Sequence, residues 1–129
     1  MQTKLVALLI FVLVSTSSIG QARLTIVNNS MRDMTVKVMQ GPGKGSFYET
    51  VQIGAYSQET VRFYSSGTFF TKTKAVIFKK DPVYKKGKSF KVTSDETGYS
   101  VLTLTFTIKE SAVVESSGQS ISKAEFDQN

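Results

Sequence analysis

The stretch YSVLTLTFTIKE (residues 99–110) decides the fold class of this chain. It places Leu102, Leu104, Phe106 and Ile108 on one side of an extended strand and the residues between them, mostly threonine, on the other. Alternation with period two is the pattern of a half-buried β-strand, and β-branched and aromatic residues favour strands. The segment therefore predicts a strand with one face in a hydrophobic core.

The same alternation recurs along the chain at short intervals. It is present in LTIVN, MTVKVMQ, FYETVQI, ETVRFY and TFFTKTKAVIF, and turns rich in Gly, Ser or Asn separate these runs. After the first 22 residues no segment has a convincing helical period. About seven strands of this kind predict an all-β fold, an antiparallel two-sheet sandwich of immunoglobulin-like or transthyretin-like topology.

Residues 1–22 have the layout of a secretory signal peptide. Lys4 precedes the apolar run LVALLIFVLV (residues 5–14), and small residues follow the run. The run is too short to cross a bilayer, which needs about 20 residues. Cleavage after Ala22 and cleavage after Gly20 both fit the small-residue rule, and an uncleaved N-terminal anchor is the alternative. We therefore expect a secreted protein, periplasmic or extracellular, with no transmembrane span in the mature chain.

The rest of the chain is long enough for one domain. We expect residues 23–110 to form the sandwich and residues 111–129, which are Ser-rich and acidic, to be a loosely ordered tail. Within that tail Ser122 stands three residues before Glu125, the spacing of a helix capping box. At most one helical turn can follow it.

The composition excludes several kinds of site. The chain contains neither Cys nor His, which rules out disulfides, a Ser-His-Asp triad, a Cys-His pair and a zinc site with nitrogen or sulfur ligands. The adjacent acids Asp95 and Glu96 would point to opposite faces of a strand, so they cannot flank one bond. We expect a non-catalytic protein without cofactor or metal. An exported domain without cysteine also favours a bacterial source, since small secreted domains often depend on disulfides.

Positive charge is concentrated in one segment. Residues 69–91 contain eight lysines and one acid, whereas residues 92–129 contain two lysines and six acids. A dense group of lysines attracts anions. We expect Lys72 and Lys74 to share one face of a strand, and Pro82 and Gly87 mark the following lysines as part of a loop or hairpin. The candidate binding residues, called the lysine patch below, are Lys72, Lys74, Lys79, Lys80, Lys85, Lys86, Lys88 and Lys91.

Three kinds of partner fit the lysine patch: an anionic glycan, the anionic envelope surface and an acidic protein. Nucleic acid is disfavoured because the patch contains no arginine, the residue suited to bidentate recognition of phosphates and bases. The alternative is that the lysines only keep the protein soluble. The Gly-rich stretch GPGKGS (residues 41–46) predicts a hairpin loop that could bind a ligand. It is not a phosphate loop, since a strand rather than a helix follows it.

These observations predict an exported, non-catalytic binding or interaction module of the cell envelope or exterior, which contacts an anionic partner through a lysine-rich loop. The alternative is a structural subunit of a surface fibre or multi-chain assembly. It rests on the length and strong β-propensity of residues 99–108, because such a strand aggregates unless it is paired or covered.

Overall fold

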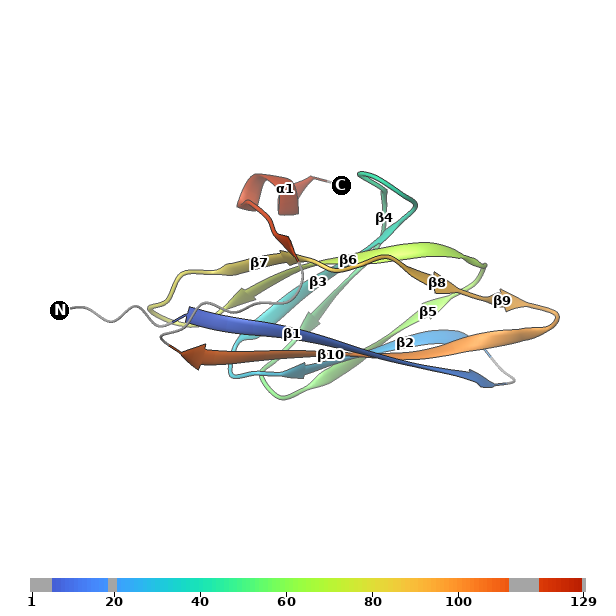
Figure 1. Cartoon of the computed structure of the whole chain (residues 1–129), viewed down its shortest axis with the longest axis horizontal. Coiled ribbons are helices and arrows are strands. Elements are labelled where there is room, and N and C mark those ends of the chain that lie inside the picture. The colour runs from blue at the N-terminus through green and yellow to red at the C-terminus, as the bar shows by residue number, and fades with distance from the viewer. Residues whose placement is uncertain (1–5, 19–20, 112–118, 129) are drawn as a thin grey trace.

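The chain folds into two β-sheets that pack face to face, with one short helix on the outside of the second sheet (Figure 1). A computed structural model describes residues 6–18, 21–111 and 119–128. The predicted class, an all-β two-sheet sandwich, is confirmed. The structure contains more strands than the seven or so predicted, because it includes an additional N-terminal strand and several strands of two or three residues.

The first sheet has the order β1, β10, β2, β5, with β9 paired to the start of β10. Its strands are β1 (Val6–Ser18), β10 (Gly98–Ser111), β2 (Ala22–Asn29), β5 (Gln58–Phe63) and β9 (Ser94–Asp95).

The second sheet has the order β11, β7, β6, β3, β4, with β8 paired to β6. Its strands are β11 (Gln119–Ser120), β7 (Val83–Lys86), β6 (Gly67–Val76), β3 (Asp33–Gln40), β4 (Ser46–Ile53) and β8 (Phe90–Val92), and the helix is α1 (Lys123–Asp127).

The hydrophobic core lies between the sheets, and β10 contributes to it as its alternation predicts. Leu102, Leu104, Phe106 and Ile108 are all at most 5% exposed, and all four belong to the core cluster. Aromatic rings from both sheets continue this core along the sandwich. The rings of Phe63 in β5 and Phe69 in β6 have centroids 4.6 Å apart. Tyr48 and Phe90 extend the same group of rings.

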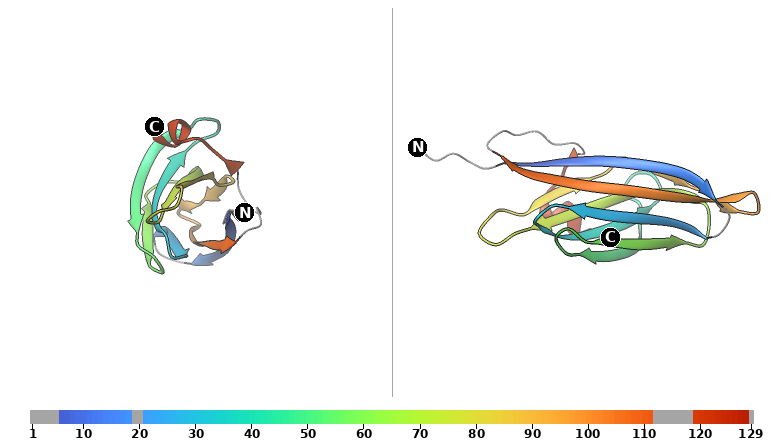
Figure 2. Two further views of the ribbon diagram at one scale, coloured as in Figure 1. Left: turned by 90° about the vertical axis from the view of Figure 1, so that its left-hand side faces the viewer. Right: turned by 90° about the horizontal axis from the view of Figure 1, so that it is seen from below.

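Strand β10 lies between the first two strands of the chain (Figure 2). It is antiparallel to β1 and parallel to β2, with Leu9 of β1 opposite Ile108 and Leu24 of β2 opposite Leu102. Most of the apolar run predicted as the centre of a signal peptide therefore forms β1 in the full-length chain, and Leu9 is fully buried there. The sandwich thus includes a segment that precedes the predicted domain at 23–110. Cleavage of residues 1–22 stays a prediction.

The C-terminal tail differs from the expected loosely ordered segment over residues 119–128. Ser122 caps α1 by accepting a hydrogen bond from the Glu125 amide, as the predicted capping box requires. Phe126 is only 4% exposed and packs near the ring of Tyr84, with centroids 5.7 Å apart. Phe126 therefore anchors this segment on the second sheet. Residues 112–118 of the predicted tail lie outside the described residues.

Candidate functional site

The lysine patch lies on the second sheet and on the connections around it. A loop and a hairpin were both predicted for the segment around Pro82 and Gly87. The structure shows a hairpin of β6 and β7, in whose register Lys72 is opposite Lys86. Ala75 faces the core. Lys72 and Lys74 lie on the opposite, outer face of β6, as the alternation predicts. Lys79 and Lys80 lie in the β6–β7 connection, Lys85 and Lys86 in β7, Lys88 just after β7, and Lys91 in β8.

Two members of the patch are buried, which the sequence did not indicate. Lys72 is 4% exposed and Lys85 is 5% exposed. The Lys85 Nζ donates a hydrogen bond to Ser120 Oγ in β11 over 2.7 Å. Burial lowers the pKa of both ammonium groups, and the nearby Lys37 charge lowers the pKa of Lys72 further. These two lysines therefore hold the C-terminal segment in place as well as carrying charge.

A buried arginine fixes the β6–β7 connection and was missed by the sequence analysis. Arg32 is 3% exposed, and its Nε donates to Glu110 Oε1 over 2.7 Å. Its Nη1 donates to the carbonyl oxygens of Ala75 and Asp81 over 3.2 Å and 2.8 Å. The hydrogen bond from Arg32 lowers the pKa of the Glu110 carboxyl group. Lys80, a member of the patch, lies 3.4 Å from the same carboxylate and is thereby partly neutralised.

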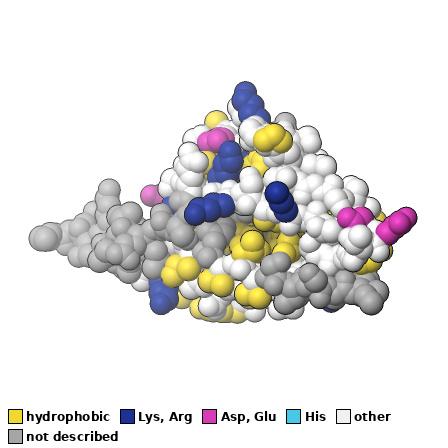
Figure 3. All heavy atoms as spheres, turned by 45° about the vertical axis from the view of Figure 1, so that its right-hand side comes forward, with side chains coloured by type: hydrophobic (Ala, Val, Ile, Leu, Met, Phe, Trp, Pro, Cys, Tyr) yellow, Lys and Arg dark blue, Asp and Glu magenta, His cyan; other side chains and the backbone are white. Residues whose placement is uncertain are grey.

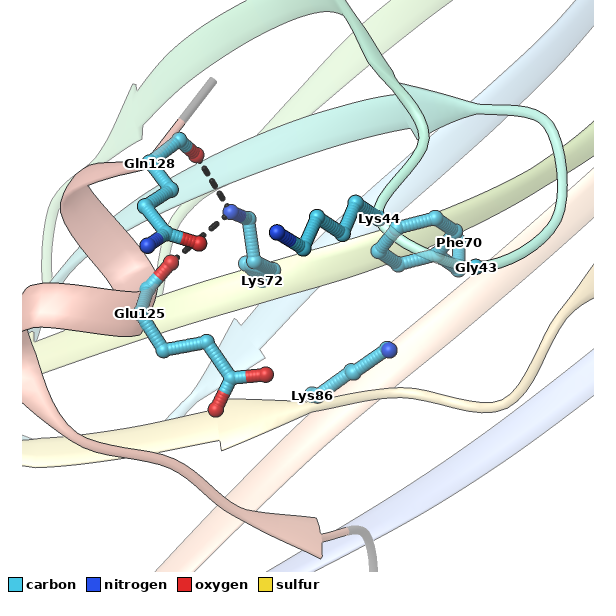
Figure 4. Close-up of a pocket in the computed structure, with 7 residues that line it drawn as sticks. All are labelled: Gly43, Lys44, Phe70, Lys72, Lys86, Glu125 and Gln128. Carbon is cyan, nitrogen blue, oxygen red and sulfur yellow. Dashed lines mark hydrogen bonds between the residues drawn. The ribbon is translucent and has the colours of Figure 1, made fainter.

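A cleft of about 440 Å³ brings two members of the lysine patch, Lys72 and Lys86, together with the Gly-rich loop and the C-terminal helix (Figure 4). Lys72 crosses its floor and donates from Nζ to the backbone carbonyls of Glu125 and Gln128. Lys44 extends from the Gly-rich loop toward the same space. The cleft is lined by Gly43, Lys44, Phe70, Lys72, Lys86, Glu125 and Gln128.

The shape of the cleft depends on the backbone of the Gly-rich loop. Gly41, Gly43 and Gly45 all have positive φ angles, which favour glycine. A Cβ atom on Gly45 would lie 2.8 Å from the Phe70 ring, so the loop approaches the sheet more closely than another residue allows. On its other side the Phe70 ring has the Lys86 ammonium 4.9 Å from its centroid. This cation–π contact helps to hold Lys86 at the cleft wall.

The opposite wall is α1, which β3 and β6 hold in place. Lys37 donates from Nζ to the Phe126 carbonyl over 2.9 Å and lies 4.7 Å from the centroid of the Phe126 ring. Together with the bonds from Lys72, these contacts bring lysines to the C-terminal end of the helix, where the backbone carbonyls carry partial negative charge.

The electrostatics of the cleft favour an anion. Three lysines line it, and Glu125 is the one carboxylate among the lining residues. Figure 3 shows one face of the molecule on which most of the Lys and Arg side chains lie over the upper half, with an acidic side chain among them, and further acidic side chains mark the right-hand tip. Among the patch members outside the cleft, Lys79, Lys88 and Lys91 are exposed and Lys74 is half-buried. The structure thus divides the predicted patch into structural lysines, cleft lysines and dispersed surface lysines.

Over residues 6–18, 21–111 and 119–128 the structure contains no group of three or more acidic side chains that could hold a metal ion. No helix within these ranges is long and apolar enough to span a membrane. Comparisons with protein-family models, with curated proteins and with solved structures found no match.

Proposed function

We propose that this protein is an exported, non-catalytic binding module of the cell envelope or exterior, and that it contacts an anionic partner through the cleft between the Gly-rich loop and α1. The observation that carries the proposal is the meeting of Lys44, Lys72 and Lys86 in one cleft. Lys44 is 28 residues from Lys72 in the sequence, so the fold rather than a local run of lysines creates this concentration of charge.

Export is supported by the character of β1. The run from Val6 to Val14 contains only apolar residues, so it lacks the polar alternation of β2 and β10. Three consecutive residues, Val12, Leu13 and Val14, are 49%, 46% and 54% exposed. A permanent edge strand normally carries polar or charged side chains on its exposed face. An unbroken apolar run is instead what a signal peptide requires.

The position of Ala22 favours one of the two predicted cleavage sites. Ala22 is fully buried, begins β2 and lies opposite Phe63 in β5. Cleavage after Ala22 would remove this core residue, whereas cleavage after Gly20 keeps it. We therefore propose that the mature chain begins at Gln21.

The partner is proposed to be a polyanion whose negative groups are spread over a surface, such as an anionic glycan or the anionic envelope surface. The cleft offers lysines only, and an ammonium group acts as a point charge without the bidentate geometry of arginine. Recognition of this kind depends on charge density and is weakened by salt.

The test is retention on heparin and on vesicles containing anionic lipid as salt is raised. In the variant Lys44→Ala/Lys86→Ala two cleft charges are lost, whereas the control Lys88→Ala/Lys91→Ala loses two dispersed charges of the lysine patch. Because each lysine near an anionic surface contributes about 1 kcal/mol, the cleft variant should bind vesicles about 30-fold more weakly at low salt. The control should bind nearly as well as the unsubstituted protein.

Two outcomes contradict the proposal. Equal losses in both variants would mean that general surface charge, and not the cleft, attracts the polyanion. Elution of the unsubstituted protein from both supports at or below physiological ionic strength would mean that the patch only keeps the protein soluble.

A second candidate function is a subunit of a surface fibre or multi-chain assembly. Strand β10 favours it, because β10 is long, uncharged from Tyr99 to Ile108, and covered along one edge by the segment predicted to be removed.

A further inference from the structure

One edge of β10 is a complete strand-binding position, which β1 fills in the full-length chain. The two strands pair antiparallel over thirteen consecutive residues without a register shift, from Val6 opposite Ser111 to Ser18 opposite Tyr99. Leu9 lies opposite Ile108 and is fully buried in the core cluster. Removal of β1 would therefore expose the backbone of β10 and part of the core at once.

The opposite edge of the first sheet is built differently. Strand β5 is shorter, and Glu59 and Arg62 place exposed charges along it. Such charges prevent edge-to-edge pairing. Strand β10 has no charged residue from Tyr99 to Ile108. Its free edge would therefore bind another strand rather than stay open to solvent.

We propose that, once residues 1–20 are removed, β10 of a second copy of this chain takes the position of β1, so that the mature protein is a two-fold symmetric dimer with a continuous sheet. The proposal rests on the export proposed above, since it requires the loss of β1. The seated β1 shows the required geometry: an antiparallel strand with an apolar residue at the position of Leu9.

The sequence of β10 selects the register of this pairing. With the two-fold axis beside Thr105, Leu102 of one copy lies opposite Ile108 of the other, and Leu104 lies opposite Phe106. All four inward residues then meet apolar partners, and Leu102 of the second copy occupies the place of Leu9. An axis beside Leu104 would instead set Ile108 opposite Ser100, a polar partner. The first register is isologous, as a closed dimer requires.

The absence of cysteine from the natural chain makes this register directly testable. In the predicted dimer, Thr105 lies opposite itself, with a Cα separation of about 5 Å. This separation permits a disulfide. The variant Thr105→Cys, expressed from the full coding sequence in an exporting bacterial host, should form a covalent dimer under mild oxidation. Mass spectrometry of the same product should give Gln21 as the first residue.

Two controls carry one cysteine each on the same outward face. Thr103 would lie opposite Thr107 of the second copy, so two Thr103→Cys side chains would be about 14 Å apart and should not crosslink. Thr60→Cys lies on β5, away from the interface, and should also stay monomeric. Light scattering of the unsubstituted exported protein measures the mass without any substitution and should give twice the mass of the processed chain.

Each outcome decides the proposal. A monomeric mass after processing overturns it, and so does an intact N-terminus, because β1 would then keep its place. Equal crosslinking of the Thr105→Cys and Thr103→Cys variants overturns the register and indicates random collision. Heparin retention separates this result from the proposed function: a monomer that still binds through Lys44 and Lys86 contradicts the dimer alone, and a dimer without retention contradicts polyanion binding alone.

Discussion

Replacement of the buried Arg32 by leucine should strongly destabilise the folded protein. Arg32 is nearly fully buried, and its guanidinium group donates to the Glu110 carboxylate, to the Ala75 carbonyl in β6 and to the Asp81 carbonyl in the β6–β7 connection. Arg32→Leu keeps an apolar side chain of moderate size but leaves these three acceptors without their donor. The perturbation therefore tests whether this cluster holds β10 to the β6–β7 connection.

The structure sets the magnitude of the effect. Removal of one partner of a buried ion pair costs about 3–5 kcal/mol, because the other charge is left without compensation. Glu110 retains 12% exposure and the ammonium of Lys80 at 3.4 Å, which favours the lower end of this range. We therefore expect a loss of about 3 kcal/mol, which is a large part of the total stability of a small domain. For a domain of this size it corresponds to a decrease in Tm of roughly 10–15 °C.

The pH dependence provides a second measure of the same contact. The hydrogen bond from Arg32 lowers the pKa of Glu110 in the folded state. The stabilisation is therefore fully present above the unfolded-state pKa of about 4.3 and is lost as the pH falls through the lower folded-state value. In the variants Arg32→Leu and Glu110→Gln this hydrogen bond from Arg32 to a carboxylate group is absent. Their free energy of unfolding should therefore fall less steeply with decreasing pH than that of the unsubstituted protein.

Urea denaturation followed by circular dichroism, at pH 7 and at steps down to pH 3, measures both effects. Arg23→Leu is the matched control, because Arg23 is exposed on β2 of the first sheet, and it should change stability by less than about 0.5 kcal/mol. The reasoning is refuted if Arg32→Leu costs less than 1 kcal/mol at pH 7, or if its stability falls with acid as steeply as that of the unsubstituted protein.

Two further predictions concern the second sheet. Gly45→Ala should lower the free energy of unfolding by about 2 kcal/mol and weaken heparin retention, because the φ of Gly45 is +64° and the new Cβ would lie 2.8 Å from the Phe70 ring. Gly43 has a similar φ but open space around it, so Gly43→Ala should lower the free energy of unfolding less in the same urea denaturation assay. Thr73→Val should raise the unfolding free energy by about 1 kcal/mol, since the Thr73 hydroxyl is the one buried side-chain polar atom without a hydrogen-bond partner in the described part of the chain. A loss of stability in that variant would show that the hydroxyl is bonded.

The fold class could be predicted because it depends on local patterns. The alternation of β10 is visible residue by residue, and it corresponds to four side chains that are at most 5% exposed. The cap at Ser122 likewise involves residues three positions apart. Patterns of this kind report which face of a strand is buried, or where a helix begins, without knowledge of the neighbouring strands.

The composition of the candidate site could not be predicted because it depends on contacts between distant segments. Lys72 is buried by the carbonyls of Glu125 and Gln128, more than fifty residues further along the chain. Arg32 resembles an exposed turn residue in sequence, yet its partner Glu110 lies 78 residues further along the chain. Charge counting located the segment that carries the lysines. It could not show that Lys72 binds backbone carbonyls, that Lys85 is buried, or that Lys86 lines the cleft.

The insertion of β10 between β1 and β2 also has a consequence for when the protein can fold. The parallel partners Arg23 and Val101 are 78 residues apart in the sequence. The first sheet therefore cannot be completed until β10 has been synthesised, although β2 and β5 can pair earlier. Pairing over such sequence distances folds in milliseconds to seconds, and synthesis proceeds at about 5–20 residues per second. The arrival of β10, and not its pairing with β2, should therefore set the time at which the first sheet is completed.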